Sequence, residues 1–317
     1  MRVLRWPAPG ATPLKRSVAT LGVFDGVHRG HAEVIRRVLA AADERACPSA
    51  VVTFDRHPAS ALSGELQPAI TSLEHRLRLL EALGLEVCVV VQFSRDVAAM
   101  DAEDFARLVF RDLLGAQLVV LGFDSRFGRG GRGRLELLRQ LSPELGFDVE
   151  VVHAVEVDGE VVSSTAIRRA ILDGRFDDAE GLLGRPVSLY GTVVPGDGIG
   201  DEIGCPTANL ELHNETIPPD GVYATWAFTD HDPLPSVTSV GRRGTFHPEA
   251  DAPRTVEVHL IGRDEELRGR DIEVRFVALL RPQRTFKGAK ELAQQIERDI
   301  RDALEVLKSN VAGTGGR

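Results

Sequence analysis

The sequence of 317 residues is poor in aromatic side chains and cysteine, and it has no long apolar run. Aromatics make up 5% of the chain, so we expect cores built from Val, Leu, Ile and Ala. Cys47, Cys88 and Cys205 lie far apart without a CxxC pair, which favours reduced thiols over disulfides, and Cys88 sits in an apolar run typical of a core. No window reaches the length of a membrane span, and the N-terminal segment lacks a signal-peptide pattern. These absences predict a cytoplasmic protein.

An excess of basic residues is also missing. The formal net charge is -9, which argues against non-specific binding to nucleic acid or to an anionic membrane, so we expect neither partner. A local basic pocket for a phosphorylated ligand is compatible with this charge. The sequence leaves a homo-oligomer open.

Short apolar runs alternate with amphipathic helical patterns from residue 17 to about residue 150. The expected strands are 17–24, 49–54, 86–93, 117–123 and 148–154, and the expected helices are 31–46, 71–84, 101–116 and 133–146. The buried helix faces are expected to carry Val34, Ile35, Val38, Leu39 and Ala42, and Leu73, Leu77 and Leu80. This alternation predicts an α/β fold with a Rossmann-like parallel sheet, in which ligands bind beyond the carboxyl ends of the strands.

The pattern changes after Pro186. The expected strands are 187–194, 221–228, 236–241, 255–262 and 272–280, and one long helix is expected at 289–308. This predicts a small antiparallel β-barrel domain with a closing C-terminal helix. The expected domains are therefore residues 1–186 and 187–308, followed by a disordered tail at 309–317.

The segment "GVFDGVHRGH" joins the first expected strand to the first expected helix. Gly26 and Gly30 have no side chains that would block the approach of a ligand to the backbone, and the start of a helix favours anions. Two imidazoles here, His28 and His31, can donate hydrogen bonds to phosphate oxygens and to charge that develops in phosphoryl transfer. Solvated loop histidines are the alternative, and the position after the first strand of an α/β pattern favours the phosphate site.

Several motifs resemble, in order, those of the bacterial bifunctional riboflavin kinase/FAD synthetase (FMN adenylyltransferase) family. "GVFDGVHRGH" is similar to its first segment and, more distantly, to other HxGH nucleotidyltransferases. The later segments are "VTFDRHP" at 52–58, "LGFDSRFGRGGRG" at 121–133, "VSSTAIR" at 162–168, "GCPTANL" at 204–210 and "TVEVHLI" at 255–261. The resemblance covers most of the chain, from about residue 17 to about residue 305.

The resemblance implies that the N-terminal domain converts FMN and ATP into FAD and pyrophosphate. The implied ATP-binding residues are Gly22, Phe24, Asp25, Gly26, His28, Gly30, His31, Asp124, Arg126, Ser163, Ser164, Thr165 and Arg168, with His28 and His31 as catalytic residues. Flavin-binding roles are implied for His57 and Pro58. The alternatives are a turn-forming Asp124, an ordinary helix cap at 163–165 and a structural His57. Ser125 departs from the family, which usually has an aromatic residue there.

The C-terminal domain is implied to phosphorylate riboflavin to FMN. Glu257 is the candidate base, with Val256 and Val258 pointing the other way, and we expect its carboxylate at the barrel mouth. Thr207 and Asn209 carry hard oxygens suited to Mg²⁺ bound with ATP. The implied kinase nucleotide-binding residues are Gly191, Gly196, Gly198, Pro206, Thr207 and Asn209, and the three glycines together with Gly200 are expected to form a flexible flap over the nucleotide. An exposed strand glutamate and an ordinary PTAN turn are the alternatives.

Three positions of this half depart from the family: Asp201 replaces an arginine, Gly244 a proline and Gly288 a serine. The leading hypothesis is a bifunctional enzyme that uses ATP and Mg²⁺ with flavins as substrates and products. The alternatives are a monofunctional FAD synthetase with a weak or degenerate kinase domain, a non-catalytic flavin-binding protein, and another HxGH nucleotidyltransferase.

Overall fold

The computed structural model describes residues 1–7, 12–58, 68–196, 205–213, 216–229, 233–242, 254–263 and 265–310. By the contacts among its residues, the chain divides into two compact units. Unit 1 comprises Met1–Ala69 and Leu73–Ser164, and unit 2 comprises Ile70–Ser72 and Thr165–Arg317. The sequence places the domain boundary after residue 186, whereas the contacts assign residues 165–186 to unit 2. Of the expected tail, residues 311–317 lie outside the described residues.

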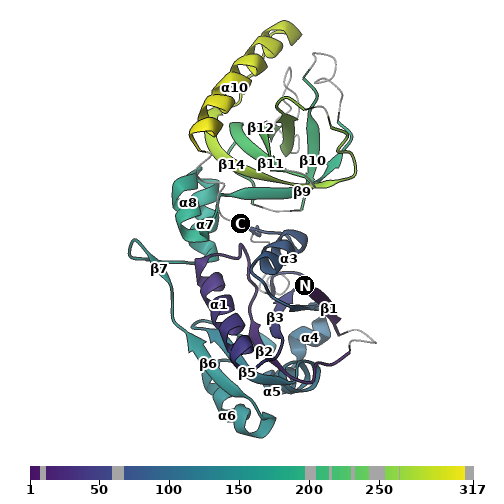
Figure 1. Ribbon diagram of the computed structural model, residues 1–317, viewed down its shortest axis with the longest axis vertical. Helices are drawn as coiled ribbons and strands as arrows, with labels where there is room; N and C mark the ends of the chain where they lie inside the picture. Colours follow the sequence, from purple (N-terminus) through teal and green to yellow (C-terminus); the bar gives the residue numbers. More distant parts are fainter. Residues whose placement is uncertain are drawn as a thin grey trace. The chain divides into compact units, whose positions relative to one another are not determined.

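The described residues of unit 1 form a six-stranded parallel sheet in the order β1-β4-β3-β2-β5-β6 (Figure 1). The strands are β1 (Arg2–Trp6), β2 (Ser17–Leu21), β3 (Ser49–Phe54), β4 (Val87–Val91), β5 (Ala116–Gly122) and β6 (Asp148–Val152). Every residue of β2, β3 and β4 is buried, as parallel strands covered on both faces require. The predicted parallel sheet is confirmed, and the edge strand β1 is an addition to it.

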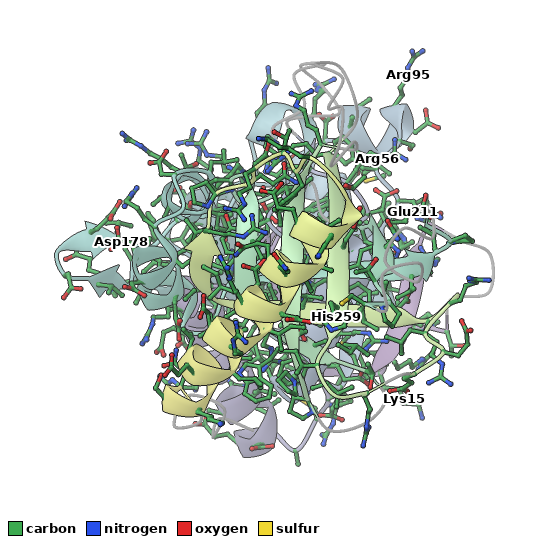
Figure 2. The ribbon with its side chains drawn as sticks, turned by 90° about the horizontal axis from the view of Figure 1, so that it is seen from above. Lys15, Arg56, Arg95, Asp178, Glu211 and His259 are labelled. Carbon is green, nitrogen blue, oxygen red and sulfur yellow. The ribbon has the colours of Figure 1, made fainter. Side chains whose placement is uncertain are left out.

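The helices of unit 1 are α1 (Arg29–Glu44), α3 (Leu73–Ala82), α4 (Arg95–Ala99), α5 (Ala102–Phe105) and α6 (Leu135–Leu145), with a small hairpin of β7 (Glu156–Val157) and β8 (Glu160–Val161). The predicted face of α1 is confirmed for Val34, Ile35, Val38 and Ala42, while Leu39 is partly buried and Ala41 joins the core. The charged side chain of Arg95, at the start of α4, points away from the ribbon (Figure 2).

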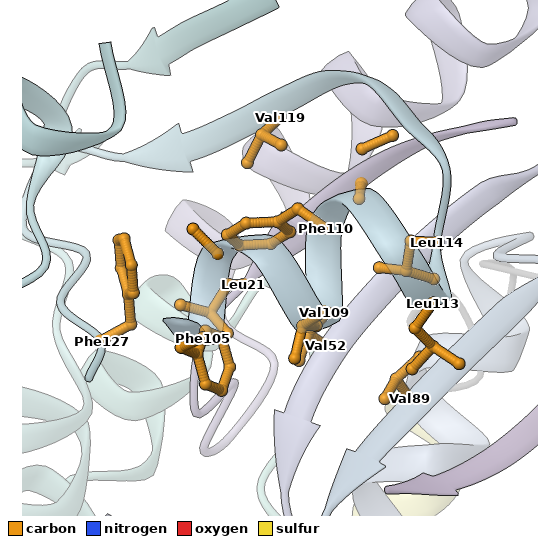
Figure 3. Close-up of a cluster of buried hydrophobic side chains, with 14 of the residues drawn as sticks. Leu21, Val52, Val89, Phe105, Val109, Phe110, Leu113, Leu114, Val119 and Phe127 are labelled. Atoms are coloured by element: carbon orange, nitrogen blue, oxygen red, sulfur yellow. The ribbon is translucent and has the colours of Figure 1, made fainter. Parts of the chain in front are cut away.

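The segment after α5 is a π-helix, η1 (Ala106–Leu113), where the sequence predicts one α-helix over 101–116. The Leu114 N–H donates to the Val109 carbonyl at 3.0 Å, which spans five residues instead of four. This wider turn lets Phe105 and Phe110, five residues apart, both pack on Phe127, with ring centroids 5.8 and 6.1 Å away (Figure 3). The aromatic cluster thereby fixes the loop that follows β5.

Unit 2 contains a closed antiparallel barrel in the order β10-β13-β12-β11-β14-β9, which confirms the predicted barrel. Its strands are β9 (Ser188–Val194), β10 (Ala208–Leu212), β11 (Gly221–Phe228), β12 (Leu234–Arg242), β13 (Arg254–Leu260) and β14 (Asp271–Arg281). The helices of the unit are α7 (Ser164–Leu172), whose first residue is counted with unit 1, α8 (Phe176–Leu183) and the C-terminal α10 (Ala289–Ser309).

The barrel has an interior lined by apolar side chains and hydroxyls. Val256 and Val258 of β13 are buried, and the register pairs them with Val240 and Thr238 of β12. Thr225 bonds the hydroxyls of Ser236 and Thr238 at 2.8 and 2.7 Å, so these buried polar groups satisfy one another. On the outer face, Val222, Ala224 and Val237 form a core with Ala303 and Leu307 of α10.

Cys88 is fully buried in β4, as expected for a core residue. Burial raises the pKa of its thiol to about 12. Cys47, Cys88 and Cys205 are all free thiols. Within the part of the chain that the structure describes, no helix is both long enough and apolar enough to cross a membrane.

Candidate active sites

The sheet of unit 1 has a point where its strand order reverses. From β2 the chain passes through α1 to β3 on one side, and it reaches the other side of β2 only with β5. In open parallel sheets, ligands bind beyond the carboxyl ends of the strands at such a point. The two segments that leave the sheet here are residues 22–28 after β2 and residues 123–127 after β5.

His28 and His31 form a reciprocal cap at the start of α1. Nδ1 of His28, the N-cap residue, accepts from the backbone N–H of His31 at 3.3 Å, and Nδ1 of His31 accepts from the backbone N–H of His28 at 3.4 Å. The two rings stack with centroids 3.6 Å apart and an interplanar angle of 16°. Any side chain at Gly30 would press on the His28 ring, since a Cβ atom would lie 3.2 Å from its Nδ1 atom.

This arrangement fixes the tautomer of both neutral rings. Because each Nδ1 atom accepts a hydrogen bond, the proton of each ring resides on Nε2. Both rings therefore present Nε2–H as a donor, at a helix start whose backbone dipoles also favour an anion. The geometry suits the oxygen atoms of a phosphate group.

The turn before His28 holds an unusual backbone conformation. Phe24, Gly26 and Val27 have φ values of 55°, 81° and 41°. Positive φ is costly for non-glycine residues such as Phe24 and Val27, and it persists where the surroundings enforce it. The Phe24 ring packs over Gly22, where a Cβ atom would come within 3.1 Å of it, and it lies 5.0 Å from the His31 ring. Packing thus holds the strained turn and one of the two imidazoles together.

Asp25 and Ser164 join the histidine turn to the start of α7. Asp25 is buried, and its carbonyl accepts from the Ser164 hydroxyl at 2.9 Å. The sequence predicted both as ATP-site residues, and the structure brings them together. Ser163 directly precedes Ser164, whereas Thr165 and the buried Arg168 are counted with unit 2, so their approach to the histidines stays a prediction.

The loop after β5 is anchored at one end and exposed at the other. Phe127 is buried and pairs with Gly133 through two backbone bonds, and Gly128 packs against Ala102, where a Cβ atom would lie 2.6 Å from its Cα atom. Asp124 and Arg126 are exposed at the carboxyl edge of the sheet. Phe123 is 55% exposed, the only exposed Phe, Tyr or Trp among the described residues.

His57 and Pro58 follow β3, the strand next to β2, at the same edge of the sheet. His57 is exposed and Pro58 half-buried. The next residues, 59–67, lie outside the described residues, so the flavin-binding role expected here stays a prediction.

A buried arginine that the sequence did not suggest lies beneath this edge. Arg76 on α3 is 4% exposed, and its Nη1 atom donates to the Val23 carbonyl at 2.6 Å and to the Phe54 carbonyl at 3.1 Å. The available signal was its spacing, because it lies three residues after Leu73 and four before Leu80, on the apolar face of the helix. The expected stripe holds for Leu80, which is buried, whereas Leu73 and Leu77 are partly buried.

In unit 2 the predicted kinase residues meet on neighbouring strands. Asn209 of β10 lies directly opposite Glu257 of β13, and Glu257 lies opposite Ser239 of β12. Thr207 directly precedes β10, so the PTAN segment runs into a strand. Glu257 and Asn209 are both half-buried.

Glu257 lies on the outer face of the barrel, which corrects the expectation of a carboxylate at the barrel mouth. Val256 and Val258 point away from Glu257, as predicted, but it is the valines that point inward, and alternation along the strand turns Glu257 outward. The interior of a small barrel is filled by side chains and leaves no room for a substrate. A site built on this carboxylate therefore lies on the outer surface of β10, β12 and β13.

The first glycine of the expected flap lies in a strand instead. Gly191 lies within β9, paired with Leu212 and Ile272, so it is a strand residue and its placement in a flap is wrong. Gly196 follows β9, and a Cβ atom on it would collide with the amide nitrogen of Asn209. Gly198, Gly200, Asp201 and Gly244 lie outside the described residues. Gly288 is the N-cap residue of α10.

Pro206, the remaining predicted kinase residue, is exposed, and its carbonyl accepts from Nδ1 of His259 at 2.8 Å. His259 follows Glu257 by two residues and shares its face. Among the described residues, no group of three His, Cys, Asp or Glu side chains could hold a metal ion. The Thr207 hydroxyl, the Asn209 amide and the Glu257 carboxylate are hard oxygens, the kind of ligand that Mg²⁺ prefers alongside phosphate.

Comparison with known proteins matches both parts of the chain. The FAD synthetase family model matches residues 11–166, and the riboflavin kinase family model matches residues 183–307. A bifunctional riboflavin kinase/FMN adenylyltransferase of Escherichia coli (strain K12) is 36% identical over 295 residues, 92% of this chain and 93% of that protein. One of Bacillus subtilis (strain 168) is 35% identical over 298 residues, 93% of each chain.

A solved structure extends the likeness to three dimensions. It comes from Streptococcus pneumoniae, is described as a macrolide-efflux protein, and is 30% identical with a TM-score of 0.79. The match covers 94% of this chain and 97% of that chain. The fold of the chain is thus similar to that of a solved structure.

Proposed function

This chain belongs to the family of bifunctional riboflavin kinase/FMN adenylyltransferases, and we propose that it makes FMN and FAD at two separate sites, one on each unit. It is an enzyme with an FAD synthetase domain and a riboflavin kinase domain, and it uses flavins and ATP. The observation that carries the assignment of sites is the paired His28 and His31 at the switch point of the sheet.

Adenylyl transfer takes place at the histidine turn. An oxygen of the FMN phosphate attacks the α-phosphorus of ATP, a new P–O bond forms, and the bond to the β-phosphate oxygen breaks to release pyrophosphate. The attacking oxygen is already anionic, so this step needs alignment and charge stabilisation and no general base. The Nε2–H donors of His28 and His31 bind triphosphate oxygens where charge builds up.

The other residues predicted for FMN adenylylation complete this site in the proposal. Ser163, Ser164, Thr165 and Arg168 supply hydroxyls and a guanidinium fork for the phosphates. Asp124 and Arg126 contact ATP from the loop after β5. His57 and Pro58 bind the flavin from the loop after β3. The position of these loops at one edge of the sheet supports this part of the proposal.

Riboflavin phosphorylation takes place on the outer face of the barrel. The terminal ribityl hydroxyl is neutral, so it needs a base to accept its proton as its oxygen attacks the γ-phosphorus and ADP leaves. Glu257 is that base. Thr207 and Asn209 would hold Mg²⁺ together with the ATP phosphates, and the metal would neutralise phosphate charge there. The cross-strand pairing of Asn209 with Glu257 supports this assignment, because it sets base and metal ligand side by side.

One assay tests the proposed function. The purified chain is incubated with ATP and Mg²⁺ and either riboflavin or FMN, and the flavins are separated by chromatography. We expect FMN and FAD from riboflavin, and FAD from FMN. FAD from FMN alone would leave only the adenylyl-transfer half standing, and no product from either flavin would refute both halves.

Gly196→Ala is expected to lower riboflavin phosphorylation by about tenfold or more, because the new methyl group displaces the Asn209 amide. FAD formation from FMN should be unchanged, and chromatography of the flavins from the same preparation measures both. Gly181→Ala is the matched control, since a Cβ atom there meets nothing within 4 Å and alanine favours a helix. An unchanged kinase rate in Gly196→Ala would argue against Asn209 as a ligand.

Phe123→Ala is expected to raise the KM of one FAD synthetase substrate about tenfold, because stacking of a planar ring on an aromatic side chain contributes about 1–3 kcal/mol. Phe123 offers such a ring at the switch point. Separate titrations of ATP and FMN show whether adenine or the flavin stacks there. Phe123→Tyr keeps a ring and should retain the wild-type KM values, and Val161→Ala, at another exposed apolar residue, should change neither. Unchanged KM values in Phe123→Ala would exclude this contact.

A further inference from the structure

Arg76 connects the ends of two strands to the start of the histidine turn. Its Nη1 atom donates to the carbonyl of Val23, which follows β2, and to the Thr53 hydroxyl and Phe54 carbonyl at the end of β3. Thr53 itself donates to the Val23 carbonyl at 2.9 Å. One guanidinium nitrogen thus joins three acceptors at the carboxyl edge of the sheet.

Burial of the Arg76 side chain at this position costs free energy, because its charged guanidinium is removed from water. Burial lowers the pKa of the Arg76 guanidinium, and the nearby Asp25 carboxylate gives the largest opposing effect. Its Nε atom is buried without a hydrogen-bond partner. An apolar residue would fill this helix position at a lower cost, since the neighbouring positions of the face, Leu73 and Leu80, are apolar. The arginine therefore serves some purpose other than filling the core.

Arg76 binds the backbone at the point where the chain leaves β2 and enters the histidine turn. The Val23 carbonyl belongs to the peptide before Phe24, whose φ is 55°, and the strained segment ends in the His28–His31 cap. Strained backbone needs surroundings that enforce it. The bonds from Arg76 and Thr53 fix this peptide, and the turn that follows sets the two imidazole rings.

We propose that Arg76 is a positioning residue for FAD formation, acting through the Val23–Phe24 peptide to hold His28 and His31 in their reciprocal cap. This inference rests on the proposed function of unit 1. It assigns to α3 a part in the reaction that its predicted leucine stripe does not suggest. Arg76 itself is buried and does not touch substrate.

The test uses the full chain with Arg76→Met, which keeps the apolar stem and removes the charge and donors, and Arg76→Lys, which keeps the charge. We expect kcat for FAD formation from FMN to fall about a hundredfold in the methionine variant and about tenfold in the lysine variant, as misplacement of a catalytic group does. The KM values for ATP and FMN should change less than about threefold, since the binding groups remain. Arg78→Met, at an exposed position of the same helix, is the matched control and should match the wild type.

A spectroscopic readout separates positioning from general loss of structure. The ¹⁵N chemical shifts of the histidine rings report the tautomer, and the wild type should show the proton on Nε2 of both His28 and His31. In folded Arg76→Met, where thermal unfolding remains cooperative, both rings should shift toward a mixture of tautomers. If Arg76→Met does not fold, the kcat for FAD formation and the histidine ¹⁵N shifts of Arg76→Lys test the inference instead.

Two results would overturn the inference. Either is enough: a folded variant at position 76 with the wild-type kcat, or a reduced kcat with the ring tautomers unchanged. A wild-type chain that makes no FAD from FMN would instead refute the proposed function, so the two failures are distinguishable.

Discussion

His28→Asn is expected to lower the rate of FAD formation from FMN at least about a hundredfold, because loss of one preorganised donor to developing charge costs about 10²–10³ in kcat. Asparagine is a good N-cap residue, so its side-chain oxygen can still accept from the His31 N–H. The variant therefore removes the Nε2–H donor and keeps the cap. Riboflavin phosphorylation by the same chain should be unchanged. Chromatography of the flavins measures both rates.

Two further variants divide the roles of His28. His28→Ala removes the donor and the cap together, and should additionally lower the free energy of unfolding of unit 1 by about 1 kcal/mol. His153→Ala, at an exposed histidine after β6, should leave the FAD rate and the stability unchanged. If His28→Asn retained the wild-type rate, the ring at position 28 would serve only to cap α1.

Glu257→Gln is expected to lower riboflavin phosphorylation by about 10²–10⁴, the usual contribution of a general base. Glutamine has nearly the shape of glutamate and cannot accept the ribityl proton, so the loss should fall on kcat. FAD formation from FMN should remain at the wild-type rate, because the proposed adenylyl transfer involves no group of the barrel. Steady-state rates with riboflavin and with FMN measure the two effects on one preparation.

The matched control for this variant is Glu211→Gln. Glu211 is an exposed carboxylate two residues after Asn209 on β10, and its removal changes the charge of the unit by the same amount. Glu211→Gln should retain both activities. Equal losses of both activities in Glu257→Gln, or a kinase loss in Glu211→Gln of the same size, would contradict the role of Glu257.

The predicted elements differ from the structure where packing between residues distant in the sequence determines the local conformation. Periodicity gives the type of almost every strand and helix of unit 1, because β2, β3 and β4 are continuously apolar and α1 is amphipathic. It fails for β1, whose strand conformation depends on pairing with β4. It also fails for η1, because the wider helical turn is coupled to the packing of Phe105 and Phe110 on Phe127, which lies far along the chain.

The candidate sites divide in the same way. The position of the HxGH segment between strand and helix identified His28 and His31, whereas Asn209 and Glu257 were implied by the resemblance of their segments to a known family. The roles of these residues stay proposals. Spacing missed Arg76, because a helix pattern treats a charged residue as exposed, and only the ends of β2 and β3 provide the acceptors that keep it buried.

The sequence by itself determined the fold class, the order of the two domains and the segments proposed to carry the sites, because these depend on local periodicity and on residues adjacent in the chain. Only the tertiary structure decided the reciprocal cap of His28 and His31, the buried bonds of Arg76 and the outer-face position of Glu257. These features depend on backbone conformation, on acceptors contributed by distant strands and on closure of the barrel. None of those is encoded in the spacing of neighbouring residues.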